Sequence, residues 1–335
     1  MPIAKSVAEA LKKRTASLIR GAAGERDERQ AADVAARKSD RKQILSPDDV
    51  LGKYNAKRLL YTTLGGTLRP ITDQDLREFQ RNAKAAGRRY RAGITAQTVI
   101  DHSRAEDRKR AQREIKFSVP LSHAAGMFQF ATNASPQSNV RRHYVAIDFI
   151  NYSAVLASPR AAAKMADYLV KSYLKFDCDC GRHRFWFRYI STIGRFNAGR
   201  DETGFPKIRN PGLTGVACKH VLRTMAVIQQ PAFKAFLARA ITKDRERVGR
   251  AKVTKLRGKD IEAIAQEQLR PAAIKARALP KPSPAAIRKA QASIQAVAAK
   301  VPRGSAKAKM HVDALLALKV ISAKQHAAIV AQLKG

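Results

Sequence analysis

Cysteine, tryptophan and acidic side chains are scarce in this chain of 335 residues. It has three cysteines and one tryptophan, and aromatic residues make up 6% of it. An odd and small number of cysteines does not fit the disulfide framework of a small secreted protein, and we expect a reducing compartment. No apolar run reaches the roughly 18 residues that a membrane-spanning helix needs. We therefore expect neither a membrane span nor a secretory signal peptide.

The shortage of acidic residues leaves a large positive excess. The chain has 65 Lys and Arg against 27 Asp and Glu, a formal net charge of +38. A chain with this charge repels itself unless an anionic partner neutralises it. Nucleic acid is the leading candidate, because each phosphate contact releases a counterion, and a membrane surface is the second. The hydrophobic fraction of 45% is typical of a folded protein.

The order of the predicted elements indicates an α+β fold. Ser46, Thr72 and Thr95 each resemble the capping residue at the start of a helix. Helices are expected at residues 47–64, 73–86, 95–113, 160–174, 216–228 and 231–247. Alternating or β-rich runs predict antiparallel strands at 114–121, 127–132 and 143–153. We predict a mostly helical protein with a small antiparallel sheet and an inserted ββα zinc unit.

Composition and charge divide the chain into regions. Alternating charges mark its beginning, and prolines interrupt a basic stretch near its end. We expect a charged helical arm (1–45), a helical N-terminal region (46–113), an α+β core (114–250) containing the zinc unit (175–228), a basic, proline-interrupted linker with helices (251–306), and a C-terminal helical hairpin (307–335).

All three cysteines lie in one segment, as Cys178-Asp-Cys180 and Cys218-Lys-His220. Alternate side chains of an extended strand face the same side, so Cys178 and Cys180 can present two thiolates to one ion. With Cys218 and His220 they make a closed set of three thiolates and an imidazole, which is typical of a structural Zn²⁺ site. Two alternatives stay open: His183 replaces His220, or the cysteines never meet.

The C-x-C and C-x-H pairs resemble the SWIM-type zinc finger, a short ββα unit associated with DNA binding or protein interaction. The match covers residues 175–228, and its gap of 37 residues between Cys180 and Cys218 is longer than in ordinary members. The run from Arg209 to Leu213, before Cys218, is similar to a variant in virion-associated proteins of tailed bacteriophages, and so is the region from Gly93 to Ile100.

This resemblance implies a structural virion component in contact with other virion proteins, as part of a multi-subunit assembly. Its place would be the capsid interior, the neck or among proteins ejected with the genome, and otherwise the host cytoplasm.

Basic residues interleaved with aromatic ones suit contacts with nucleic acid, most simply DNA bound through its phosphates without sequence preference. The alternative is that the rings fill the core around the metal and the charges form a solvated face. The candidate nucleic-acid contacts are Arg182, Arg184, Arg188, Lys219, Arg223, Arg245, Arg247, Arg250, Lys252, Lys255 and Arg257.

Catalytic motifs are missing from the sequence. It contains no phosphate-cradling glycine loop, no G-x-S-x-G and no H-E-x-x-H. We therefore expect no enzymatic activity; a nucleic-acid-processing enzyme that uses Asp148 or Asp167 is the least favoured alternative. A further alternative is a protein–protein adaptor in virion assembly that uses the zinc unit and the C-terminal hairpin and binds little DNA.

Overall fold

The structure, a computed structural model, describes residues 2–35, 44–52, 60–247, 254–255, 258–269, 326–327 and 330–331. The chain divides into two compact units, Met1–Ala276 and Arg277–Gly335, and nearly all described residues belong to the first. Most of the predicted linker and hairpin lies outside the described residues. The architecture below is that of the first unit.

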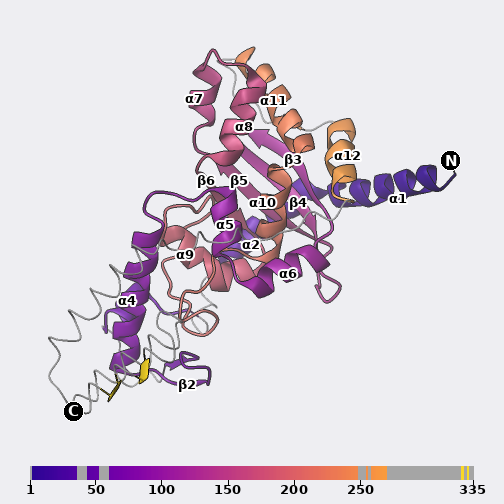
Figure 1. Cartoon of the computed structure of the whole chain (residues 1–335). Helices are drawn as coiled ribbons and strands as arrows, with labels where there is room; N and C mark the ends of the chain where they lie inside the picture. The colour runs from indigo at the N-terminus through magenta and orange to yellow at the C-terminus, as the bar shows by residue number, and fades with distance from the viewer. Residues whose placement is uncertain are drawn as a thin grey trace. The chain divides into compact units, whose positions relative to one another are not determined.

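An antiparallel sheet of five strands forms the centre of this unit (Figure 1). Its order is β6-β5-β4-β3-β7, and every neighbouring pair is antiparallel. The strands are β3 (Ser118–Ala124), β4 (Met127–Asn133), β5 (Arg142–Phe149), β6 (Leu174–Cys178) and β7 (Thr254–Lys255). With the surrounding helices, this sheet confirms the predicted α+β fold.

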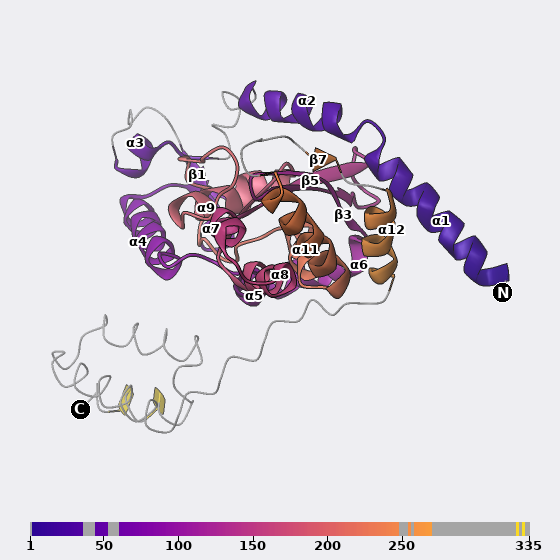
Figure 2. The same cartoon turned by 90° about the horizontal axis from the view of Figure 1, so that it is seen from above.

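One face of the sheet packs against helices to form the main core (Figure 2). Phe128 and Phe130 of β4 and Val145 of β5 are fully buried there. Helix α10 (Lys219–Ile228) contacts strands β3 to β6, and nine of its ten residues are buried. The other helices of this layer are α5 (Ala96–His102), α6 (Ala105–Glu114), α8 (Ala162–Lys171) and α11 (Pro231–Arg245).

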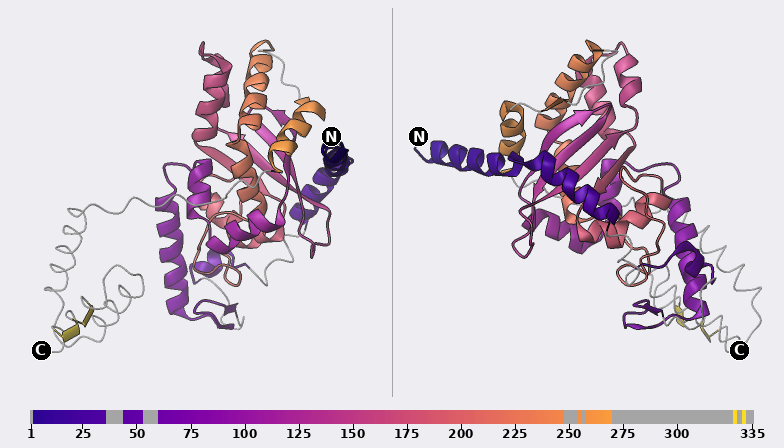
Figure 3. Two further views of the ribbon diagram at one scale, coloured as in Figure 1. Left: turned by 45° about the vertical axis from the view of Figure 1, so that its right-hand side comes forward. Right: turned by 180° about the vertical axis from the view of Figure 1, so that it is seen from behind.

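The opposite face of the sheet is crossed by the first two helices, α1 (Pro2–Ile19) and α2 (Ala22–Ala35), as the view from behind shows (Figure 3). Side chains alternate along a strand, so Ala131 and Tyr144 face this second layer. Leu11 and Leu18 of α1 join them in a smaller core with α12 (Gly258–Glu267).

All three capping predictions hold, and Thr95 caps α5, but the first predicted helix is much shorter than expected. Ser46 and Thr72 both form complete capping boxes, at the starts of α3 (Pro47–Val50) and α4 (Asp73–Arg89). The helix predicted over 47–64 ends at Val50, and Tyr61–Thr62 instead forms β1, paired with β2 (Arg69–Pro70).

One other predicted helix is divided, and the elements that follow β5 differ in their bounds from those predicted. The helix predicted over 95–113 breaks between α5 and α6, where Ser103 and Arg104 are extended and the Ser103 hydroxyl donates to the carbonyl oxygen of Val99. The strand predicted over 143–153 ends at Phe149 and is followed by α7 (Tyr152–Ala157), and the helix predicted over 160–174 is α8, with Leu174 already in β6. Local hydrogen bonding to a nearby carbonyl competes with helix continuation.

None of the helices in the described part of the chain combines the length and apolar character needed to cross a membrane.

Candidate metal centre

Strand β6 and helix α10 bring the two halves of the Cys/His pattern together. Cys178 ends β6 and Cys180 follows it, while Cys218 caps α10 and His220 is the second residue of that helix. All four side chains are buried, and none of the four residues is more than 4% exposed. One ligand atom from each lies within 4.8 Å of the others, so this group can bind a metal ion.

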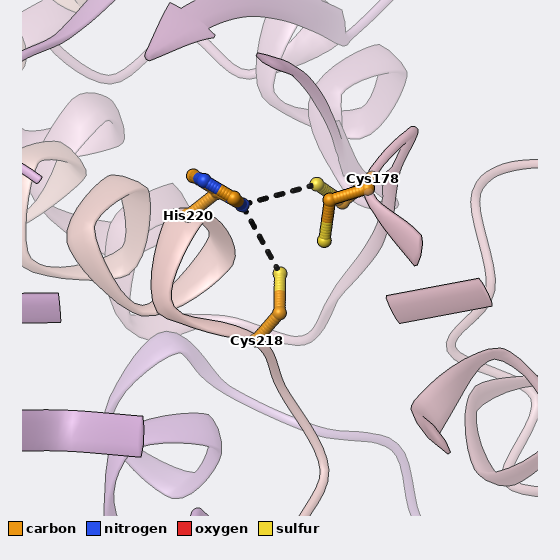
Figure 4. Close-up of side chains that lie close together, drawn as sticks. Cys178, Cys218 and His220 are labelled. Carbon is orange, nitrogen blue, oxygen red and sulfur yellow. Dashed lines mark hydrogen bonds between the residues drawn. The ribbon is translucent and has the colours of Figure 1, made fainter. Parts of the chain in front are cut away.

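The ring of His220 points Nδ1 toward the sulfur atoms (Figure 4). Nδ1 lies 4.0 Å from Sγ of Cys178 and 4.0 Å from Sγ of Cys218. A tetrahedral ion with metal–sulfur bonds of about 2.3 Å has ligand–ligand edges of roughly 3.8 Å. Movements of a few tenths of an ångström therefore bring these atoms to coordinating distance.

Electrostatics at the centre favour ligand forms for two of the residues. Burial lowers the pKa of His220, which keeps the imidazole neutral with a lone pair to donate. Burial acts against ionisation of Cys218, but hydrogen bonds from the other two thiols and from the N–H groups of His220 and Val221 hold its pKa well below the ordinary value. Burial and the neighbouring thiols raise the pKa of Cys178 well above it. A bound cation would offset that cost.

Polar contacts around the centre fix the ligand-bearing segment. Asp179, between the two cysteines, accepts hydrogen bonds from the backbone N–H of Tyr144 and from Arg29, and its carboxylate lies 2.9 Å from Nδ1 of His143. The ring of His143 in turn contacts that of His220, with centroids 4.3 Å apart. Such outer contacts orient the ligands of a metal site.

His183 is not part of the ligand group. It opens a π-helical turn (His183–Phe187) that begins three residues after Cys180, and its backbone N–H donates to Sγ of Cys180. Its Nε2 lies 3.0 Å from Asp177. The structure thus places this histidine beside the centre, where it supports Cys180 and does not replace His220.

The aromatic residues of the segment chiefly fill the core. Phe187 and Phe196 are buried, and Trp186 is partly buried against the main core. The guanidinium of Arg182 lies over the Trp186 ring, 4.0 Å from its centroid. This packing agrees with the alternative in which the aromatic rings fill the core and do not contact nucleic acid.

Three of the predicted nucleic-acid contacts are buried inside the protein. Arg188, Lys219 and Arg223 are 2%, 6% and 4% exposed. Nζ of Lys219 lies 2.7 Å from Glu114, and Arg223 donates to the carbonyl oxygens of Lys116 and Gln268. In this conformation their charged groups are directed at internal partners and not at a phosphate backbone.

Among the remaining candidates, Arg182, Arg184 and Arg245 are partly buried and have internal partners. Arg182 pairs with Asp107 at 2.6 Å and Arg184 with Asp33 at 3.2 Å. Arg245 donates to the carbonyl oxygens of Val155 and Arg160. Arg247 is exposed and Lys255 lies in β7, whereas Arg250, Lys252 and Arg257 fall outside the described residues.

Sequence reasoning missed the acidic partners of these cations. Asp33, Asp107 and Glu114 lie 155, 75 and 105 positions from Arg188, Arg182 and Lys219, respectively. No local spacing signals a pair so far apart. The composition offered a general clue: with 27 acidic residues among 65 basic ones, each acidic side chain has many possible ion-pair partners.

No family model matches the chain, and neither does a curated protein or a solved structure.

Proposed function

We propose that this protein is non-catalytic, is held together by a structural Zn²⁺ ion and associates with nucleic acid through phosphate contacts. The buried group of Cys178, Cys180, Cys218 and His220 carries the proposal. Three thiolates and one imidazole fill a tetrahedral shell and leave no position for a reacting water. Thiolate ligands favour zinc over magnesium or calcium. The ion would join β6 to α10 across the core.

Metal analysis tests the zinc part of the proposal. Full-length protein purified without added chelator should contain about one equivalent of zinc per chain. The variants Cys180→Ser and Cys218→Ser should each lose that metal. Wild-type protein that carries no metal, and melts at the same temperature as both variants, would contradict it.

A basic groove supports the nucleic-acid part. The groove has a volume of about 920 Å³ and lies between α1 and the loops at one end of the sheet. Lys13, Arg14, Arg113 and Lys116 line it and are exposed. Together with the net charge of +38, this surface suits the phosphates of DNA better than the buried candidates do.

Binding of labelled duplex and single-stranded DNA, followed by fluorescence anisotropy, tests this part. Affinity should fall by orders of magnitude between about 50 and 200 mM salt if several phosphates are contacted. The double variant Lys13→Gln/Arg14→Gln should bind more weakly than Lys164→Gln/Lys171→Gln, which removes the same charge from exposed positions on α8. Binding that ignores salt would contradict the proposal.

The proposed location is the virion of a tailed phage, in its capsid interior, at its neck or among its ejected proteins. The resemblance of residues 93–100 and 209–213 to virion-associated proteins of tailed phages is the basis for this location, and packaged DNA would supply the neutralising charge. Mass spectrometry of purified particles should detect the chain. Its absence from the particles, with presence in the infected cell, would contradict this location.

A protein–protein adaptor is the second candidate function. Ile150 and Tyr168 are 48% and 49% exposed, and Tyr168 accepts a hydrogen bond from Asn151, next to Ile150. These neighbouring exposed side chains offer a small contact for another protein. Weak binding to both forms of DNA, with retained zinc, would favour this candidate.

A further inference from the structure

Helix α2 is attached to the body of the protein by charged side chains. Glu25, Arg29 and Asp33 are spaced four residues apart and therefore lie on one face of the helix. Glu25 pairs with Arg142 at 2.9 Å, and Arg29 pairs with Asp179 at 2.8 Å. From residue 23 to residue 33 no side chain is buried. Apolar packing thus contributes little to holding this stretch in place.

Asp33, the third of these charged residues, lies among three arginines of the body. Oxygen atoms of Asp33 lie 3.2 Å from Arg184, 2.7 Å from Arg188 and 3.3 Å from Arg200. Asp33 stands in the last turn of α2, where the helix dipole disfavours a negative charge. The helix itself therefore gives no reason for an acid there, whereas the arginine cluster does.

Contacts that do not involve α2 also position the arginines. Arg188 pairs with Asp177 and donates to the carbonyl oxygen of Cys178. Arg200 lies 3.9 Å from Glu202, and the guanidinium of Arg184 lies over the ring of Phe185. Nη1 of Arg200 is buried and has no hydrogen-bond partner among the described residues. The cluster is thus preorganised, and within the described part of the chain Nη1 of Arg200 is a donor that Asp33 does not use.

Guanidinium groups bind carboxylates and phosphates with the same fork of N–H donors. A phosphodiester carries one negative charge and two free oxygens, as a carboxylate does. We propose that Arg184, Arg188 and Arg200 form a phosphate-binding site for a nucleic-acid backbone, that Asp33 occupies this site in the free protein, and that nucleic acid displaces α2. This inference rests on the proposed association with nucleic acid and adds a masked site to the exposed groove.

A charge-neutralising substitution tests the masking. In the full-length protein, Asp33→Asn should bind labelled single-stranded DNA about tenfold more tightly than wild type, as expected if the open form is roughly a tenth of the population. Asp27→Asn is the matched control. It makes the same charge change on the same helix, but the side chain of Asp27 is 63% exposed and, among the described residues, its one ion-pair partner is Arg26. Its affinity should stay within about twofold of wild type.

A second variant locates the gain in the arginine cluster. Adding Arg200→Ala to Asp33→Asn should remove most of the tenfold gain, whereas Arg200→Ala alone should change wild-type binding little. Hydrogen exchange gives an independent measurement: the amides of residues 23–33 should lose protection in Asp33→Asn, and in wild type when DNA is added, while those of residues 9–18 keep theirs.

The outcomes separate this inference from the proposed function. Wild-type binding with equal affinities for Asp33→Asn and Asp27→Asn, and α2 amides that stay protected when DNA is added, would overturn the masked site and leave the exposed groove intact. Absence of DNA binding by every variant would overturn both. Equal metal content in all variants would show that the folded state is the same.

Discussion

The candidate metal centre and the ion pairs that hold α2 both involve the short segment from Asp177 to Arg188, but they consist of different chemical groups. Cys178 and Cys180 lie close to Cys218 and His220 inside the core, whereas Asp177, Asp179 and Arg188 take part in charged contacts on its outer side. The first set is buried thiols and an imidazole; the outer contacts are ion pairs. One stretch of chain thereby contributes both to a group that can bind a metal ion and to a contact that salt can weaken.

The two regions should differ greatly in strength. Structural zinc sites contribute on the order of 10 kcal/mol of apparent binding free energy. Ion pairs near the surface contribute about 0.2 to 1 kcal/mol each, and salt screens them. The comparison indicates that β6 and α10 should stay joined under conditions in which α2 separates from the body.

Loss of a metal ligand should have the largest effect. We expect Cys218→Ser to lower the free energy of unfolding by several kcal/mol, on the order of 5, because the binding free energy of the ion is then lost. Urea unfolding of the full chain measures this. Cys178→Ser should give a similar loss, and the double variant should add little if both residues bind the same proposed ion. Additive losses would contradict a shared site.

The second-largest effect is expected from substitution of Arg188, which contacts both Asp177 beside the candidate metal centre and Asp33 of α2. Arg188→Met leaves the carboxylates of Asp177 and Asp33 without a major partner, so we expect about 3 kcal/mol of destabilisation. Arg239→Met is the control, because Arg239 is 58% exposed and its removal should cost less than about 0.5 kcal/mol. Equal midpoints of unfolding for the two variants would show that burial adds nothing to this ion pair.

The ion pair between Arg69 and Asp75, at the start of α4, should have an intermediate effect on stability. Hydrogen bonds from Arg69 and from the backbone and hydroxyl of Thr72 lower the pKa of Asp75 from 3.8 to about 2. Because the folded-state pKa is depressed, this stabilisation is complete above about pH 4 and is lost as the pH falls toward 2.

The Asp75→Asn variant should therefore be less stable than wild type at pH 7, by on the order of 1 kcal/mol, and the difference should shrink at pH 2.5. Asp73→Asn, an exposed position in the same helical turn, is the control and should show a smaller difference. The same gap between Asp75→Asn and wild type at both pH values would contradict the depressed pKa.

The smallest expected effect is that of salt on the attachment of α2. Raising the salt concentration from about 0.05 to 0.5 M shortens the Debye length severalfold and should speed hydrogen exchange in residues 23–33. Exchange in α1 should change little, because Leu11 and Leu18 hold that helix by apolar packing. Parallel changes in both helices would remove the distinction drawn between them.

Sequence reasoning was most successful where the signal was local. Ser46 and Thr72 start helices because their capping boxes involve residues three positions away. Strands β3, β4 and β5 follow from alternation and turn residues within a few positions. The helix predicted over 47–64 failed because β1 is stabilised by pairing with β2, and a two-residue strand has too short a pattern to detect.

For the candidate site, the sequence by itself determined which residues can be ligands, since every cysteine of the chain lies in the two short pairs around Cys178 and Cys218. That these pairs meet, and that His220 and not His183 joins them, was decided only when β6 packed beside α10. The roles of the charged residues were likewise decided by the fold. A net charge can be counted from composition, but Arg188, Lys219 and Arg223 became internal because distant acids and carbonyl oxygens reached them. Coordination chemistry depends on residue type, whereas the availability of a charge depends on burial, and burial is a property of the whole tertiary structure.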